Sequence, residues 1–340
     1  MTVDEGRETS AVFAILEEAP TRVVPATARL RFDVDAERLA RDVDVLTGAD
    51  WRAQPPHDPD DPNDPYHPDW KVLTLRAPGG DRRRIDPGGP GLAPFEYTEL
   101  ARETPYVVEL LESLPTDCRS VRLMSLAPGA RVNEHTDTPS GFPHGFLRLH
   151  APVVTTEGAV LVVDGEPTTW QPGTLWYGDF ARPHSLRNSG TRRRVHLIID
   201  CDVTPGVLAL FPVEFRQRLP MASVLFARHP VPLWPFELAR FECRFAIPDA
   251  FLDWGSGRGL SGGAARVGTI RAADGTLVLS VDGEPWAALV HIGAGEFRCE
   301  GWTEERTLQV DARPGGSVRF SVRTGSARED VVVPVDPISG

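Results

Sequence analysis

Short apolar runs separated by turn residues fill the middle of this 340-residue chain and limit its fold more than any other feature. The runs recur from Arg119 to Asp202. Four turn-forming pairs separate them: Pro128-Gly129, Asp164-Gly165, Pro172-Gly173 and Ser189-Gly190. Strands at this regular spacing predict a β-sandwich or barrel. The 31 glycines and 32 prolines add turns throughout, so we expect a mainly β protein with flanking helices.

The length exceeds that of an ordinary single core and predicts more than one domain. We assign residues 1–205 to a first domain, 206–262 to a helical connector rich in Phe, Leu and Trp, and 263–340 to a smaller β-rich accessory domain. In the last region, Asp274-Gly275 and Asp282-Gly283 predict hairpin turns on either side of a strand. The role of this domain stays open.

Periodicity predicts further elements in the first domain. They are a strand over residues 27–35, a helix over 36–46, a strand over 70–76 and a helix in the C-terminal part of 97–114. Residues 1–24 are expected to form a short helix or tail. The Pro/Asp-rich stretch 54–68 predicts an irregular loop, which either covers an active site or is a surface excursion.

The net charge of −12 makes a nucleic-acid partner improbable, because an acidic chain repels phosphate backbones. The four cysteines lie far apart and form no C-x-x-C motif, which argues against structural zinc and favours reduced thiols in a cytoplasmic protein. We find no signal peptide and no membrane span in the sequence, so no membrane partner is expected.

The strongest chemical signal is His135-Thr136-Asp137, with His184 following 49 positions after His135. On a strand, His135 and Asp137 would share one face, with Thr136 turned away and Cα atoms ~6.5 Å apart. Two imidazoles and one carboxylate form the facial triad of non-haem iron(II) oxygenases. The open face of the ion then accepts a chelating 2-oxo acid and dioxygen. The spacing recurs at His67-Pro68-Asp69, which we attribute to loop composition because proline separates the two residues.

Two basic stretches strengthen this signal. Arg194 lies ten residues after His184, at the start of a predicted strand. A guanidinium suits the far carboxylate of a dicarboxylic 2-oxo acid, because it forms two hydrogen bonds and stays charged when buried. Arg148 and His150 share one face of the predicted strand 146–154. Either that face is exposed, or both side chains point into the barrel beside the co-substrate.

Residues 27–202 resemble the aspartyl/asparaginyl β-hydroxylase family of 2-oxoglutarate dioxygenases, which includes free-amino-acid hydroxylases such as the proline cis-4-hydroxylases. Three segments carry the resemblance: Arg122–His135 (RLMSLAPGARVNEH), Arg148–Val154 (RLHAPVV) and Gly178–Asp200 (GDFARPHSLRNSGTRRRVHLIID). The segment after about residue 205 does not share it.

The resemblance implies a double-stranded β-helix, the jelly-roll barrel of cupins, that uses iron(II), 2-oxoglutarate and O2. It implies that His135, Asp137 and His184 bind iron and that Arg194 pairs with the 2-oxoglutarate carboxylate. The further co-substrate contacts that it implies are Arg148, His150 and, more loosely, Ser125. Some members lack the acidic ligand, whereas this chain keeps Asp137.

The resemblance favours hydroxylation of the β-carbon of Asp or Asn, either free, carrier-bound or within a peptide. Proline or another free amino acid is the next candidate. The side chains considered as substrate contacts are Trp70, Lys71, Arg122, His144 and Arg182. The C-terminal domain would contact a peptide or carrier protein, or serve in packing or homodimerisation. A competing class is a non-oxygenase cupin, either an isomerase or a small-molecule binder, which has no need of Arg194; an interaction scaffold would not need the triad.

Overall fold

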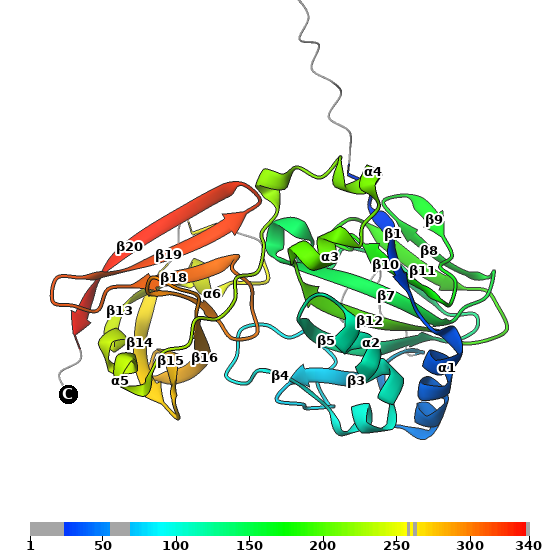
Figure 1. Cartoon of the computed structure of the whole chain (residues 1–340), viewed down its shortest axis with the longest axis horizontal. Helices are drawn as coiled ribbons and strands as arrows, with labels where there is room; N and C mark the ends of the chain where they lie inside the picture. Colours follow the sequence, from blue (N-terminus) through cyan, green and yellow to red (C-terminus); the bar gives the residue numbers. More distant parts are fainter. Residues whose placement is uncertain (1–23, 55–68, 257–258, 261–263, 338–340) are drawn as a thin grey trace, which may run out of the picture.

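The computed structural model describes residues 24–54, 69–256, 259–260 and 264–337. The predictions made for residues 1–23 and 55–68, including His67 and Pro68 of the His67-Pro68-Asp69 motif, lie outside this range. The described chain is mainly β and forms two β structures, a pair of facing sheets and a closed barrel (Figure 1).

The larger sheet of the first unit is eight-stranded and antiparallel. Its strands, in spatial order, are β1 (Thr27–Asp33), β10 (Thr174–Gly178), β7 (Phe146–Val154), β12 (Arg194–Asp202), β5 (Cys118–Leu126), β3 (Trp70–Pro78) and β2 (Arg52–Ala53), with β4 (Phe95–Tyr97) paired to β3. The smaller sheet contains β6 (Arg131–His135), β11 (His184–Asn188), β8 (Ala159–Val163) and β9 (Glu166–Thr168). The two sheets form the expected jelly roll.

One face of the larger sheet is covered by the helices α1 (Ala36–Val45) and α2 (Pro105–Ser113). The Asp35 side chain begins α1 by accepting hydrogen bonds from the backbone N–H groups of Glu37 and Arg38. Alternate residues of β12, Val195 to Ile199, enter the apolar core beneath these helices. The intervening residues of β12 therefore face the interior between the sheets. The short 3-10 turns of this unit are η1 (Leu46–Gly48), η2 (Glu99–Glu103) and η3 (Phe142–His144).

The C-terminal unit is a closed antiparallel barrel. Its strands are β13 (Cys243–Pro248), β14 (Ala265–Ala273), β15 (Thr276–Val281), β16 (Glu284–His291), β17 (Glu296–Cys299), β18 (Arg306–Val310), β19 (Ser317–Thr324) and β20 (Ala327–Pro337). The two predicted hairpin turns are confirmed: Asp274 and Asp282, like the glycines that follow them, have positive φ, as a two-residue hairpin requires.

The segment between the two units differs from the predicted helical connector over residues 206–262. It contains only short helices, α3 (Pro205–Ala209), α4 (Val213–Arg216), α5 (Pro235–Leu238) and α6 (Asp249–Leu252), and the 3-10 turns η4 (Met221–Ser223) and η5 (Ala239–Phe241). Strand β13 lies within this range and pairs with β14 and β20 to close the barrel. The aromatic-rich composition of this segment predicts helices, but alternate residues of β13 are buried, and burial of every second residue is the period of a strand.

None of the helices in the described part of the chain has the length and apolar composition needed to cross a bilayer. The four cysteines form no disulfide, and burial raises the pKa of Cys243 and Cys299 to about 12, so these thiols stay protonated at neutral pH.

Candidate metal centre and co-substrate cavity

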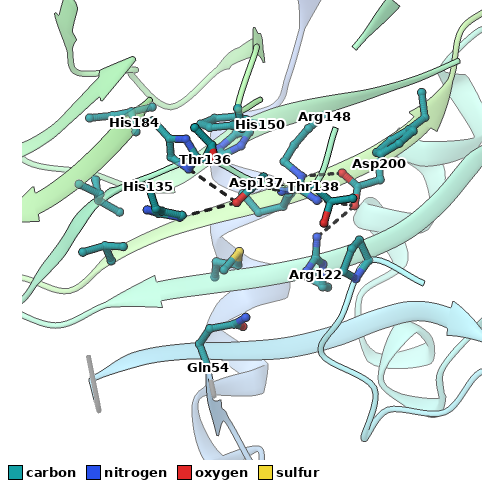
Figure 2. Close-up of a pocket in the computed structure, with 18 of the residues that line it drawn as sticks. Gln54, Arg122, His135, Thr136, Asp137, Thr138, Arg148, His150, His184 and Asp200 are labelled. Atoms are coloured by element: carbon teal, nitrogen blue, oxygen red, sulfur yellow. Dashed lines mark hydrogen bonds and ion pairs between the residues drawn. The ribbon is translucent and has the colours of Figure 1, made fainter. Parts of the chain in front are cut away.

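The predicted triad converges at one end of the smaller sheet. His135 is the last residue of β6 and pairs in register with His184, the first residue of β11. The Nε2 atoms of His135 and His184 lie 3.6 and 3.8 Å from Oδ1 of Asp137. One ligand atom from each residue lies within 4.8 Å of the others. Three side chains from two separate stretches of sequence therefore surround one point (Figure 2).

The local reason for this arrangement differs from the predicted one. Strand β6 ends at His135, so Thr136 and Asp137 continue outside the regular strand. The backbone N–H of Asp137 donates to the carbonyl of Phe180, 2.9 Å away, which holds this segment beside the start of β11. Thr136 lines the cavity instead of turning away from it, because strand alternation no longer applies there.

Backbone carbonyls orient both imidazoles. Nδ1 of His135 donates to the carbonyl of Asn133 at 2.9 Å, and Nδ1 of His184 donates to that of Arg182 at 3.0 Å. Since a carbonyl only accepts, each Nδ1 carries the proton and each Nε2 keeps its lone pair for an ion. Burial lowers the pKa of His184, which favours the neutral, ligating form. Two imidazole nitrogens and a carboxylate oxygen fit iron(II).

A buried ion-pair network adjoins the triad. Arg148 forms an ion pair with Asp137 and also contacts Asp200, with Nε 2.7 Å from Oδ1. Arg122 binds the same carboxylate, with Nη2 3.0 Å from Oδ2. Burial alone would raise the pKa of Asp200, but Arg148 and Arg122 hold that pKa below its usual value. Sequence reasoning missed Asp200. It lies on β12 six positions after Arg194, and this even spacing indicates that both side chains are on the same face of the strand.

Arg194 is 5% exposed and has a different environment from Arg148. Its Nη2 lies 2.8 Å from Nδ1 of His196, and no carboxylate in the described part of the chain forms an ion pair with it. Burial lowers the pKa of Arg194 to about 9. A buried, unpaired guanidinium is costly, so this one is suited to an anion that enters the cavity.

His150 lines the same cavity as this arginine and the triad. Its ring stacks on Phe180 with a centroid separation of 4.8 Å, and burial, together with the charge of Arg194, holds its pKa well below the usual value. Its buried Nε2 has no hydrogen-bond partner among the residues that the structure describes. A neutral imidazole with an unused nitrogen can bind a polar ligand.

The triad, Arg148, His150 and Arg194 all line one cavity of ≈ 320 Å³. This volume is at the lower end for ligand pockets and suits small molecules. Of the side chains considered as substrate contacts, Trp70 and Arg122 also line it. Lys71 lines a separate hollow, and Arg182 forms ion pairs with Asp164 and Asp179.

The prediction for Ser125 is wrong. Met124 lines the cavity, whereas the hydroxyl of Ser125 accepts a hydrogen bond from Arg193, 2.9 Å away, on the opposite side of β5. Neighbouring residues of a strand point to opposite faces, so a residue next to Met124 cannot share its cavity. Ser125 lies on a strand that borders the cavity, but its side chain points to the face of that strand away from the co-substrate cavity.

Comparison with known proteins identifies the class. Residues 34–203 match the family model described as aspartyl/asparaginyl beta-hydroxylase, and the chain belongs to this family. An L-proline cis-4-hydroxylase from Rhizobium meliloti (strain 1021) is 27% identical over 156 residues, which cover 44% of this chain and 52% of the relative. The chain thus spans about half the length of this curated relative.

Two solved structures are also similar. An oxidoreductase of the 2OG-Fe(II) oxygenase family from Burkholderia pseudomallei is 18% identical, with a TM-score of 0.36 over 54% of this chain and 86% of that chain. AviO1 from Streptomyces viridochromogenes Tue57 is 14% identical, with a TM-score of 0.34 over 53% of this chain and 91% of that chain.

Proposed function

We propose that this protein is an iron(II)- and 2-oxoglutarate-dependent dioxygenase that hydroxylates an amino-acid side chain. The observation that carries the proposal is that a cation-binding triad and an anion-binding arginine line the same cavity. His135, Asp137 and His184 place three metal-binding atoms at one point, and Arg194 presents a buried cation that has no carboxylate partner in the described ranges. Family membership supports the same activity.

Each residue has a defined role in this proposal. His135 and His184 would bind iron through Nε2, and Asp137 would bind it through its carboxylate. Arg148 would hold Asp137 in place, because its guanidinium contacts Asp137 and is itself anchored on Asp200. Arg194 would receive the far carboxylate of 2-oxoglutarate, and the unused nitrogen of His150 would face the same co-substrate.

When bound, iron(II) supplies the activation of dioxygen that couples the two half-reactions. One oxygen atom enters the succinate that forms as 2-oxoglutarate loses carbon dioxide, and the other enters a substrate C–H bond as hydroxyl. The chain contributes position and shielding from water, because the apolar side chains of Leu161, Phe180 and Leu186 line the cavity beside the triad.

The first substrate candidate is the β-carbon of Asp or Asn, either free, carrier-bound or in a peptide. A free amino acid such as proline is the second candidate, and the curated relative named L-proline cis-4-hydroxylase supports it. A panel of these compounds, followed by mass spectrometry of the oxygenated product, distinguishes the candidates.

The decisive test is Arg194→Ala, with Arg192→Ala as the matched control because Arg192 is exposed two positions away. We expect Arg194→Ala to weaken metal-dependent 2-oxoglutarate binding at least about 30-fold, because a desolvated charge pair contributes roughly 2–5 kcal/mol. Metal binding should persist in both variants, and succinate formation should persist in Arg192→Ala. A wild-type protein that binds iron(II) without binding or consuming 2-oxoglutarate would belong to another class of cupin.

A further inference from the structure

We propose that the C-terminal barrel forms the substrate-side wall of the catalytic cavity through Trp254 and Trp302, and that this wall selects an amino acid with a large apolar or aromatic side chain. The selectivity rests on the proposed dioxygenase function but favours apolar amino acids over Asp and Asn, the first candidates named above, whereas the wall itself is a feature of the fold. Both tryptophans line the cavity that contains the triad, although they lie outside the segment that matches the family model.

An aromatic surface leads from the barrel toward the metal centre. The rings of Trp254 and Trp302 have centroids 4.7 Å apart, and Trp302 meets Phe146 edge-on at 5.7 Å. Phe146 is the first residue of β7 and shares the cavity face of that strand with Arg148 and His150. A ligand that extends from the metal toward the barrel therefore passes Arg148 and then meets three aromatic rings.

Arg119 holds this wall against the jelly roll. It forms a buried ion pair with Asp202, with Nη1 3.0 Å from Oδ1, and it donates hydrogen bonds to the backbone carbonyls of Gly301 and Trp302. The hydroxyl of Thr303 donates to the carbonyl of His144 at 2.7 Å. These contacts place the turn that carries Trp302 at a defined position beside β5 and β7.

A loop of the jelly roll holds Trp254 from the other side. The Gly91 N–H donates to the carbonyl of Glu300 at 3.0 Å, and the Gly91 carbonyl accepts from Ala288 at 2.9 Å. A Cβ atom at Gly89 would lie 2.5 Å from the Trp254 ring, so only glycine permits this close approach. The loop therefore packs closely against the barrel. Pro87 of the same loop lines the cavity.

The chemistry of this wall sets the ligand class. Arg119 and Arg122, which line the cavity with the two tryptophans, already have carboxylate partners, Arg119 with Asp202 and Arg122 with Asp200. The indole N–H of Trp302 is buried without a hydrogen-bond partner among the described residues, but the faces of the two rings carry no donor or acceptor, so the carboxyl or amide group of an Asp or Asn side chain would lose water against them. An aliphatic or aromatic side chain would bury apolar surface there and could stack on the rings.

The test compares Trp254→Ala with Trp234→Ala. Trp254 is partly buried at the wall, whereas Trp234 is 68% exposed in the segment between the two units. The probes are L-leucine, L-phenylalanine, L-aspartate and L-asparagine. Their binding is measured by calorimetry to the full chain, with Mn(II) and 2-oxoglutarate and again without either, and their hydroxylation is measured with iron(II).

We expect the wild-type protein to bind L-leucine or L-phenylalanine more tightly than L-aspartate or L-asparagine. Trp254→Ala should weaken that binding at least tenfold, and Trp234→Ala should leave it unchanged. Binding of 2-oxoglutarate and succinate formation without substrate should change less than twofold in Trp234→Ala. Because Trp302 is 5% exposed in the barrel core, Trp302→Phe replaces the alanine variant there, and its thermal unfolding is recorded.

Preference for L-aspartate or L-asparagine, no binding of either apolar probe, or equal affinities in Trp254→Ala and the wild type would each overturn the proposed wall. Failure of the proposed function has a different signature, which is the absence of metal-dependent 2-oxoglutarate binding in the wild type. The measurements without metal and co-substrate still decide whether Trp254 contacts the apolar probes in that case.

Discussion

The interiors of the jelly roll and of the barrel are built from the same kind of strand but are filled with opposite chemistry. Between the two sheets, the inward side chains of β5, β7 and β12 include Arg122, Arg148, His150, Arg194 and Asp200. The barrel's hydrophobic core is aromatic and aliphatic, with Phe245, Leu279, Phe297, Leu308 and Phe320 among its residues, although this unit also buries Glu304, Glu305 and Arg306 next to one another in the chain. One interior is organised for binding, and the other is organised for stability.

The jelly roll tolerates a charged interior because its larger sheet has a second, apolar face. Val195, Leu197 and Ile199 of β12 pack in the core beneath α1 and α2, while their neighbours face the cavity. Within the described part of the chain, the cavity cations Arg122 and Arg148 are paired with Asp200, whereas Arg194 has no carboxylate partner. From this difference we expect substitutions in the cavity to alter mainly metal and co-substrate binding, and substitutions in the barrel core to alter mainly the free energy of unfolding.

The sharpest test of this division is His184→Ala. We expect iron-dependent succinate formation to fall by more than the roughly 100-fold that loss of an outer partner costs, because a direct ligand is removed. The unfolding midpoint of the metal-free protein should change little. His229→Ala, an exposed histidine, is the control and should keep full activity. Unchanged metal affinity in His184→Ala would remove the metal centre from the proposal.

The converse test is Phe320→Ala in the barrel, where the side chain is fully buried against Phe245 and Phe251. Truncation should lower the free energy of unfolding by about 3–5 kcal/mol, because it removes buried apolar surface and leaves a cavity. Iron affinity of the folded fraction should be unchanged. Val332→Ala, at a position 53% exposed on the adjacent β20, should have little effect in the same denaturant titration.

Asp200→Asn tests whether the charged interior also contributes to stability. The substitution leaves Arg148 and Arg122 without their shared carboxylate, and we expect a loss of about 3 kcal/mol in unfolding free energy. The comparison variant is Asp330→Asn, whose ion pairs with Arg319 and Arg328 are on the barrel surface and should contribute less than about 1 kcal/mol. Equal losses in the two variants would mean that burial does not distinguish them.

The smallest expected effect concerns Glu296, where the barrel meets the connecting segment. Burial alone would raise its pKa, but hydrogen bonds from Arg228 and Thr307 lower it to about 2. Because the folded pKa lies below the unfolded one, this stabilisation is complete above about pH 5 and declines as the pH falls toward 2. After solvent screening it should be about 1 kcal/mol at pH 7. Unfolding measured from pH 7 to 3 should show Glu296→Gln converging on the wild type, and a constant difference would contradict this origin.

Local patterns allowed much of the fold and of the candidate site to be predicted. Alternation along β12 placed Arg194 on the face opposite Val195, and the Asp-Gly pairs placed the hairpins of β14, β15 and β16. The prediction for Ser125 was wrong because it considered which strand carries the residue but not which face of that strand its side chain occupies. The connector prediction was wrong at β13 because short apolar strands and helices have similar composition.

The sequence by itself therefore determined what depends on neighbours along the chain: strand period, turn geometry and the residue types that bind a metal or a carboxylate. Only the tertiary structure decided which distant groups meet. Asp200 shares its carboxylate between Arg122 and Arg148, 78 and 52 positions away, and Arg119 reaches Trp302 across 183 positions. No local period encodes such contacts, since they form only when the sheets and the barrel pack together and bury these groups side by side.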